Sequence, residues 1–177
     1  MQVKARPFKA TLEFIENRFG PAKLKTFLAE YSEFSIINET PDFDWLELNL
    51  FIRLSEKTDS YFGFGDLSLL YEIGVFSARQ AFEKSHKLFK DITPLNFVQS
   101  GPALFASYYR VGRPEFEVLT DRKARLTIRD FCESKAVSKR IAAWLKEGIT
   151  AAGAKHASVA ESEPKDNTLS FCVEWEE

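Results

Sequence analysis

The sequence predicts an α+β protein with a multi-helix N-terminal half and a small antiparallel sheet in the C-terminal half. Up to residue 112 apolar residues recur at intervals of three and four, which is the spacing of one face of an α-helix. From residue 113 apolar and charged residues alternate, which is typical of strands with one wet face. The 177 residues suit one domain, so we expect a helical half at 1–112 and a sheet half, ββαββ, at 113–177.

The helical half begins with two short helices that meet at a corner. Leu12, Ile15 and Phe19 share one helical face before the dipeptide Gly20-Pro21, and the same spacing resumes over residues 24–31. Glycine favours the end of a helix and proline suits the start of the next one. The dipeptide therefore predicts a turn between two helices.

Two longer helices should follow. The segment that begins near Trp45 is apolar around much of its circumference, which is typical of a helix buried between layers. Asp66 offers a cap for the longest predicted helix, which runs from Leu67 to about Lys90. Gly74 and Ala78 lie on its apolar stripe, where small side chains let another helix or a ligand come close.

The stretch Ser100–Phe116 marks the change from helix to sheet. We expect residues 95–98 to be extended and a helix to follow, with Pro102 at its first position, where the missing N–H does no harm. Gly112 should end this helix and Pro114 prevents its continuation.

The sheet half should contain four strands and one helix. Apolar residues alternate with charged ones on both sides of a turn at 121–123, which predicts a hairpin. Ser134 offers the cap of a helix that ends near Gly153. The last two strands are predicted at Lys155–Ala160 and Thr168–Trp175.

Composition narrows the class of protein. With 24 basic and 26 acidic residues the chain has no field that would favour nucleic acid. It has no apolar run near 18 residues, so we expect no membrane span, and its start lacks the apolar core of a secretory signal. Cys132 and Cys172 fit reduced thiols, which favours the cytoplasm. The 17 phenylalanines indicate a large core, or a core together with an apolar pocket or interface.

No catalytic or metal-binding pattern stands out. The chain has no Gly-x-Gly-x-x-Gly and no phosphate-binding loop, and its two histidines, His86 and His156, have no predicted catalytic partner in reach. Asp42, Asp44 and Asp66 are placed as helix caps or surface charges. We therefore expect a protein that is not an enzyme and that holds no metal.

Three strings carry a family resemblance: RFGPAKLKTFLAE, FGFGDLSLLYEIGVFSARQAF and GPALFASYYRVG. In this order and spacing they resemble a bacterial family that occurs as paralogues in myxobacteria. That family is similar in fold to vinyl-reductase-type ligand-binding domains, TRAPP-type tethering subunits and haem-nitric-oxide-binding domains. The resemblance implies a helical half and a sheet half with an apolar ligand or lipid between them, and a homodimer.

The functional residues of those relatives are only partly present. In the haem domains a histidine on a long helix ligates iron, and a later Tyr-x-Ser-x-Arg pattern holds the propionates. Here His86 lies on the long predicted helix and Tyr109–Arg113 reads Tyr-x-Val-x-Arg, without the serine and at a shorter spacing. The cysteines of the other two groups have no counterpart, because Leu169 stands where a vinyl-reductase cysteine is expected. We predict no cofactor, with haem as the alternative.

Two hypotheses of function remain. The first is a non-enzymatic sensor with an apolar pocket between the two halves, and it rests on the aromatic excess and the fold analogy. The second is a pocketless dimeric scaffold, which pairs through its long helices and binds a signalling or motility protein. The residues predicted to line the pocket, with Arg113 at its mouth, are Phe82, His86, Phe89, Phe105, Tyr108, Tyr109 and Trp144.

Overall fold

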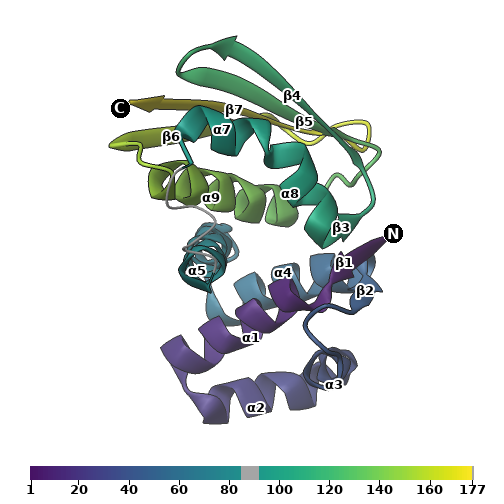
Figure 1. Cartoon of the computed structure of the whole chain (residues 1–177). Helices are drawn as coiled ribbons and strands as arrows, with labels where there is room; N and C mark the ends of the chain where they lie inside the picture. Colours follow the sequence, from purple (N-terminus) through teal and green to yellow (C-terminus); the bar gives the residue numbers. More distant parts are fainter. Residues whose placement is uncertain (85–91, 177) are drawn as a thin grey trace.

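The computed structural model describes residues 1–84 and 92–176, and it confirms the α+β class (Figure 1). In the N-terminal half the helices pack on one another below the rest of the molecule, and two short strands accompany them. These elements are β1 (Gln2–Lys4), α1 (Ala5–Phe19), α2 (Pro21–Glu30), η1 (Ser32–Ser35), α3 (Ile36–Glu39), β2 (Trp45–Glu47), α4 (Leu48–Phe62) and α5 (Ser68–Lys84).

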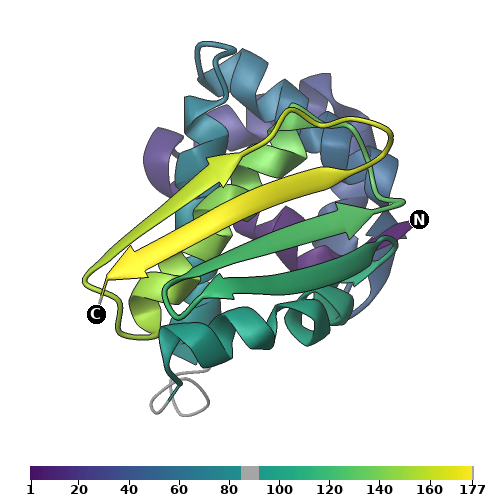
Figure 2. The same ribbon diagram turned by 90° about the horizontal axis from the view of Figure 1, so that it is seen from above.

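The C-terminal half follows the predicted ββαββ order, with two short helices before it. Its main sheet is antiparallel throughout, in the strand order β4-β5-β7-β6. Figure 2 shows this sheet from above, with α9 running beneath it. The elements are α7 (Pro94–Gln99), α8 (Gly101–Tyr108), β3 (Tyr109–Arg110), β4 (Arg113–Thr120), β5 (Lys123–Arg129), α9 (Lys135–Ala151), β6 (His156–Glu161) and β7 (Leu169–Glu176).

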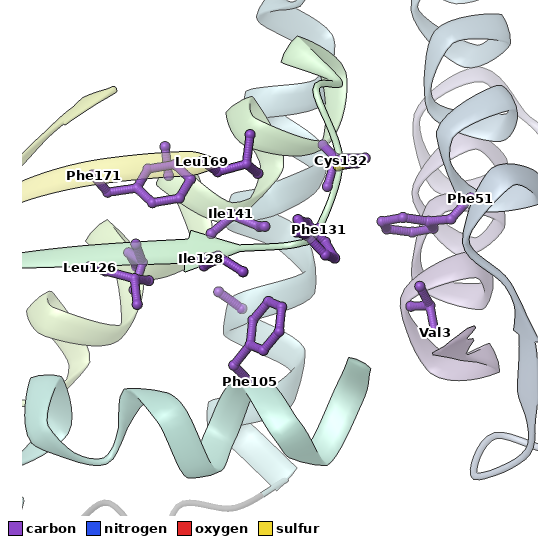
Figure 3. Packing of buried hydrophobic residues seen from close by; sticks show 14 of the residues in the cluster. Val3, Phe51, Phe105, Leu126, Ile128, Phe131, Cys132, Ile141, Leu169 and Phe171 are labelled. Carbon is purple, nitrogen blue, oxygen red and sulfur yellow. The ribbon is translucent and has the colours of Figure 1, made fainter. Parts of the chain in front are cut away.

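The inner face of the sheet forms much of the core. The apolar residues of β5 and β7 alternate with polar ones and point toward α9, as the period-two pattern predicted. Leu126 lies opposite Phe171, and both are buried beside Ile141 of α9 (Figure 3). Figure 3 also shows Phe51 of α4, whose ring points from the helical half toward Phe131. Within residues 1–84 and 92–176, none of the helices combines the length and the hydropathy that a membrane span needs.

The close contact between α5 and α9 joins the two halves. At Gly74 an added Cβ would lie 2.6 Å from the carbonyl oxygen of Arg140 and 2.7 Å from the Cβ of Ala143. A larger residue at position 74 would push the helices apart, because real Cβ atoms do not approach other atoms so closely. The prediction that Gly74 and Ala78 permit a close approach therefore matches the helix packing that the structure shows.

Three local predictions were wrong. The helix expected to end at Gly112 ends at Tyr108, because Tyr109 and Arg110 form β3 opposite β1. Residues 95–98 are helical in α7, because Thr93 caps this helix through an Asn96 N–H to Oγ1 hydrogen bond of 3.2 Å and Pro94 occupies its first turn. The helix expected near Trp45 begins three residues later, because residues 45–47 form β2.

A second, three-stranded sheet was not predicted from the sequence. Its strand order is β2-β1-β3, with Val3 of β1 opposite Leu46 on one side and Tyr109 on the other. These strands have only two or three residues, which is too short for a periodic pattern. This small sheet links the N-terminus of α1 to the C-terminus of α8, and so it ties the helical half to the sheet half.

Candidate ligand cavity

A cavity of about 290 Å³ lies between the helical half and the sheet half. Its walls come from the first turn of α1, from α4, α5, α7, α8 and α9, and from Phe116 and Leu126 of the main sheet. Phe43 also lines the cavity while its side chain is 79 % exposed, so the cavity reaches the molecular surface beside it. The volume is close to the lower end of the range for ligand pockets, about 300–1,000 Å³.

The small sheet positions one wall of the cavity. Strand β1 continues into α1 without a loop, which places Arg6 and Pro7 in the first turn of the helix and at the cavity. Pro7 is tolerated there because proline lacks a backbone N–H and the N–H groups of the first turn have no acceptor within the helix. On the other side of β1, the pairing of Val3 with Tyr109 holds the end of α8 in place.

Aromatic rings form two groups around the cavity. In the first, Phe105 and Tyr109 are stacked with ring centroids 4.5 Å apart, and Phe131 meets each of them edge-on at 5.4 Å. In the second, Trp144 stacks on Phe97 with ring centroids 5.9 Å apart, and its ring centroid lies 5.2 Å from that of Phe82. Most of the cavity lining is therefore apolar.

Arg140 is the most deeply buried charged residue of the cavity lining. Its side chain extends from α9 and the residue is 5 % exposed. Nη1 donates to Ser55 Oγ at 3.0 Å, Nη2 donates to the carbonyl oxygen of Pro7 at 3.1 Å, and the guanidinium lies 4.3 Å from the ring centroid of Phe51. All three partners are neutral.

Arg6, the second arginine of the lining, has acidic partners. Its Nη1 lies 2.6 Å from Glu13 Oε1 and 3.8 Å from Asp42 Oδ2, and its Nη2 also donates to Gln80 Oε1. Gln80 in turn donates to Glu13 at 2.8 Å. Carboxylates therefore balance the charge of Arg6 within the chain.

Burial shifts the pKa values of the groups around the cavity. It raises the pKa of Tyr109 to about 12, although the nearby positive charge of Arg140 opposes the shift. It also raises the pKa of Tyr108, against the charge of Arg6. Loss of hydration lowers the pKa of Arg140 to about 10. At neutral pH both phenols are consequently uncharged and the guanidinium is charged.

The structure brings together some of the residues that the sequence predicted for a pocket. Phe105, Tyr108, Tyr109 and Trp144 line the cavity. Phe82 is not part of the lining, but its ring contacts that of Trp144, which is. His86 and Phe89 lie outside the described residues.

Arg113 does not stand at the mouth of this cavity. It is exposed at the start of β4, outside the lining, and it pairs with Asp130. The side chain is exposed because Arg113 alternates along β4 with the half-buried Pro114 and Phe116 and therefore belongs to the outer face of the sheet.

Arg140 was missed by the sequence analysis, although a signal was present. The segment Ala136–Arg140 reads Ala-x-Ser-x-Arg, which matches the serine and the arginine of the haem-domain pattern better than Tyr109–Arg113 does. Alanine replaces the tyrosine, and Ser138 donates to Glu161 of β6 at 2.9 Å instead of lining the cavity. Of this pattern, only Arg140 belongs to the lining.

Comparison with solved structures identifies the fold. An iron(II) unliganded H-NOX mutant from K. algicida is 13% identical, with a TM-score of 0.78 over 98% of this chain and 97% of that chain. A mutant of the Cs H-NOX protein is 14% identical, with a TM-score of 0.73 over 98% and 97%. A mutant of the Tt H-NOX protein is 11% identical, with a TM-score of 0.72 over 98% and 95%.

These values show that the chain has the H-NOX fold, and they confirm that part of the predicted resemblance. No model of a protein family and no curated protein matches the chain.

The described lining of the cavity does not fit haem. It contains no histidine, cysteine or methionine, and His156, the other described candidate, is exposed on β6. The phenols of Tyr108 and Tyr109 are the remaining ordinary iron ligands in the described lining. Burial raises the pKa of both phenols, which opposes the loss of the proton that ligation of iron requires. In the described part of the chain, no group of three metal-ligating side chains is brought together either.

Proposed function

We propose that this chain is a non-enzymatic sensor domain that binds a small apolar ligand between its helical half and its sheet half. The observation that carries the proposal is the cavity of about 290 Å³, walled by stacked aromatic rings and open to the surface beside Phe43. Protein interiors normally pack at crystal-like density, so a void of this size is typical of a binding pocket. Binding at the junction would couple the ligand to the relative position of the two halves.

Several features support the remaining parts of this proposal. Cys132 and Cys172 are both free thiols, which agrees with a cytoplasmic setting. The described cavity lining has no nucleophile beside a general base, which favours binding over catalysis. The solved structures with the same fold are described as H-NOX proteins, and one study among them concerns haem redox potential, so ligand binding in this fold has precedent. The likeness to the myxobacterial, vinyl-reductase and TRAPP groups stays a prediction.

The test is native mass spectrometry of the protein purified from its native host, with a visible absorption scan of the same sample. We expect an added mass that organic extraction releases, and no Soret band. Ala81→Phe, which places a ring in the cavity lining, should abolish the added mass. The matched control is Ala103→Phe, an equal change at an exposed position of α8 outside the lining. A Soret band, or an added mass that survives Ala81→Phe, would contradict the proposal.

The alternative function is a pocketless dimeric scaffold or adaptor that binds a signalling or motility protein. One observation favours it, because Phe64 is 94 % exposed in the turn between α4 and α5. The long helices α5 and α9 pack against each other within the chain, which lowers the support for a dimer formed through them. Sedimentation equilibrium of the wild type and of Phe64→Ser tests this alternative, which requires a dimer or a captured partner that the substitution weakens.

A further inference from the structure

We propose that two copies of this chain pair along β6, so that their main sheets join into one continuous antiparallel sheet. β6 is an outermost strand in the order β4-β5-β7-β6, and Figure 2 shows it at the margin of the sheet. The inference goes beyond the proposed function, because neither β6 nor β7 contributes a residue to the lining of the cavity. It depends on the contrast between the two margins of the sheet, on the backbone of β6 and on the side chains that the pairing brings together.

The β4 margin carries features that prevent a sheet from pairing with another one. Unpaired N–H and C=O groups at a margin are a template for a further strand, and natural sheets block them with prolines, bulges and covering elements. Pro114 lacks an N–H, and the pairing of β4 with β5 is irregular between Val118 and Thr120. α8 packs against this strand so closely that a Cβ added at Gly101 would clash with the ring of Phe116. The β4 margin is therefore protected.

The β6 margin lacks these features. β6 contains no proline and no lysine, and its register with β7 is regular over all six residues. Among the described elements, only β7 beside it and α9 beneath it make extensive contact with this strand. Glu161 is its only acidic residue, and α9 holds the carboxylate: Lys139 Nζ lies 2.6 Å from Oε1, and Ser138 Oγ donates to Oε2 at 2.9 Å. The charge that would repel a second strand is thus neutralised on the α9 side of the sheet.

The hydrogen bonds of β6 leave one set of backbone groups pointing away from β7. Just after the strand, the Ser162 N–H donates to the carbonyl oxygen of Ser170 at 3.0 Å. Every second residue of an antiparallel strand bonds with the same neighbour, so Ser158 and Ala160 bond with β7 as Ser162 does. The residues whose N–H and C=O groups point to the free side, where no other described element bonds with them, are Ala157, Val159 and Glu161.

The partner that fits this margin is a second copy of β6. Two identical strands that pair in antiparallel fashion are related by a two-fold axis, and this axis keeps the outer faces of both sheets on the same side. With Val159 on the axis, the residues with free backbone groups form the hydrogen-bonded pairs, and Val159 lies opposite the second copy's Val159. β-branched pairs across strands are favourable.

The same register brings no like charges opposite each other. Ala157 lies opposite the second copy's Glu161, and Ser158 lies opposite its Ala160. Lys155, just before the strand, lies toward the second copy's Glu163, just after it. An in-register parallel pairing would instead place Glu161 opposite its own copy. The side chains therefore select the antiparallel arrangement.

The dimer should be weak and should leave the cavities independent. A strand of six residues offers less than the about 1,200–2,000 Å² that stable interfaces bury, so we expect a dissociation constant of about 10–100 µM. The joined sheet would have eight strands, four from each copy. Phe116 and Leu126, the residues of the sheet that line the cavity, belong to β4 and β5 on the side away from the two-fold axis.

The first experiment needs only the wild-type chain. Sedimentation equilibrium from about 1 µM to about 1 mM should show the average mass rising from 20.3 kDa toward twice that value. Amide hydrogen exchange by NMR should slow at least about tenfold with concentration at Ala157, Val159 and Glu161, whereas Ser158 and Ala160 exchange slowly at every concentration. A chain that stays monomeric, or a dimer that leaves the first three amides unprotected, would overturn the inference.

Variants then place Val159 at the two-fold axis. Val159→Lys should raise the dissociation constant at least about tenfold, because like charges then lie opposite each other. The matched control Val118→Lys makes the same change at an exposed position of β4 and should keep the dimer. A mixture of Val159→Lys and Val159→Glu should restore pairing, since opposite charges meet. Survival of the dimer in Val159→Lys alone, or a mixture that stays monomeric, would overturn the assignment.

Two further outcomes separate this pairing from other partners. Phe64→Ser should leave the dimer unchanged, because Phe64 lies in the turn between α4 and α5, and a dimer lost in this variant would overturn the β6 pairing. Protection of the three β6 amides by an added strand-forming peptide, without any rise in mass of the chain alone, would assign the margin to a different chain and would also overturn the dimer.

Discussion

The aromatic side chains of the helical half and those around the cavity make similar ring contacts, but they enclose different spaces. In the helical half, rings from α1, α2, η1 and α4 form one continuous cluster around Phe27, whose ring lies 5.1–5.7 Å from four others. Around the cavity, the rings fall into two separate groups with a void between them. An aromatic-rich composition therefore does not by itself distinguish a solid core from a pocket.

The difference follows from how the chain supplies the rings. In the solid cluster, α1, α2 and η1 follow one another through single linking residues, and their rings meet those at the C-terminal end of α4. The rings of the two groups at the cavity come mainly from α5, α7, α8, α9 and β3. Contacts outside the cavity fix the positions of these elements. The close packing of α5 on α9 at Gly74 sets the distance between these two helices. The three-stranded sheet β2-β1-β3 sets the position of β3. We infer that the walls do not close on the cavity because the helix packing at Gly74 and the three-stranded sheet hold them apart.

The largest expected effect compares one ring from each region. Phe27→Ala should lower the free energy of unfolding by about 3–5 kcal/mol, since Phe27 is fully buried and in contact with rings on several sides. Phe105→Ala should cost about half as much, because one side of its ring faces the void. Urea unfolding followed by circular dichroism measures both values. Equal losses would mean that the cavity wall is packed as tightly as the solid cluster.

The next effect concerns Tyr109 at high pH. The folded protein keeps the phenol proton until about pH 12, whereas the unfolded chain loses it near pH 10, so stability present below pH 10 is lost as the pH rises toward 12. The free energy of unfolding of the wild type should fall relative to Tyr109→Phe by up to about 2–3 kcal/mol over this window.

Urea titrations of both proteins at pH 8 to 11.5 measure this difference. The lowered pKa of Arg140 acts in the opposite direction, since its folded state needs fewer protons above pH 10, but it is present in both proteins. A difference that stays constant with pH would show that the phenol of Tyr109 is in contact with water.

A smaller effect distinguishes the two arginines of the cavity. Arg6→Met should destabilise the ligand-free protein by about 1 kcal/mol, because it removes a cation that Glu13 and Asp42 contact at a partly exposed site. Arg140→Met should leave the stability unchanged or raise it by about 1–2 kcal/mol, since it removes a buried charge that has no counter-ion among the described residues. Thermal and urea unfolding of ligand-free protein test the signs, and a destabilised Arg140→Met would show that the hydrogen bonds to Ser55 and Pro7 and the contact with Phe51 outweigh the cost of the buried charge.

The smallest effect is expected outside both regions. Phe64→Ser changes a side chain that is 94 % exposed, so the free energy of unfolding should shift by less than about 0.5 kcal/mol. A larger loss in a concentration-dependent unfolding experiment would indicate that Phe64 is covered by a second copy of the chain.

The sequence was sufficient for the architecture because most elements are long enough to show a period. The 3.6-residue pattern predicted α1, α2 and α5, and the period-two pattern predicted β5 and β7. It failed for the small sheet, whose strands are too short for any pattern and form only through partners distant in sequence. Residues 95–98 were misjudged because the sequence analysis did not consider Thr93 as the cap of a helix that begins at Pro94.

The site was less accessible to sequence analysis for a physical reason. Phe105, Tyr108, Tyr109 and Trp144 could be placed near the junction of the halves because aromatic residues there must face inward. Arg140 could not, because an arginine within Lys135–Ala151 ordinarily lies on the wet face of a helix. Its burial depends on Ser55, Pro7 and Phe51, which come from other elements and have no pattern in common with α9.

The pairing of Val3 with Tyr109 also sets an order of assembly during folding. The two residues are more than one hundred positions apart, so this contact closes one of the longest loops in the chain. The helical hairpin α1–α2 needs only its own neighbours, whereas β1 stays incomplete until α8 has formed and β3 follows it. During synthesis the N-terminal helices can thus pack together early. The wall of the cavity beside Tyr109 forms later, once β3 has paired with β1.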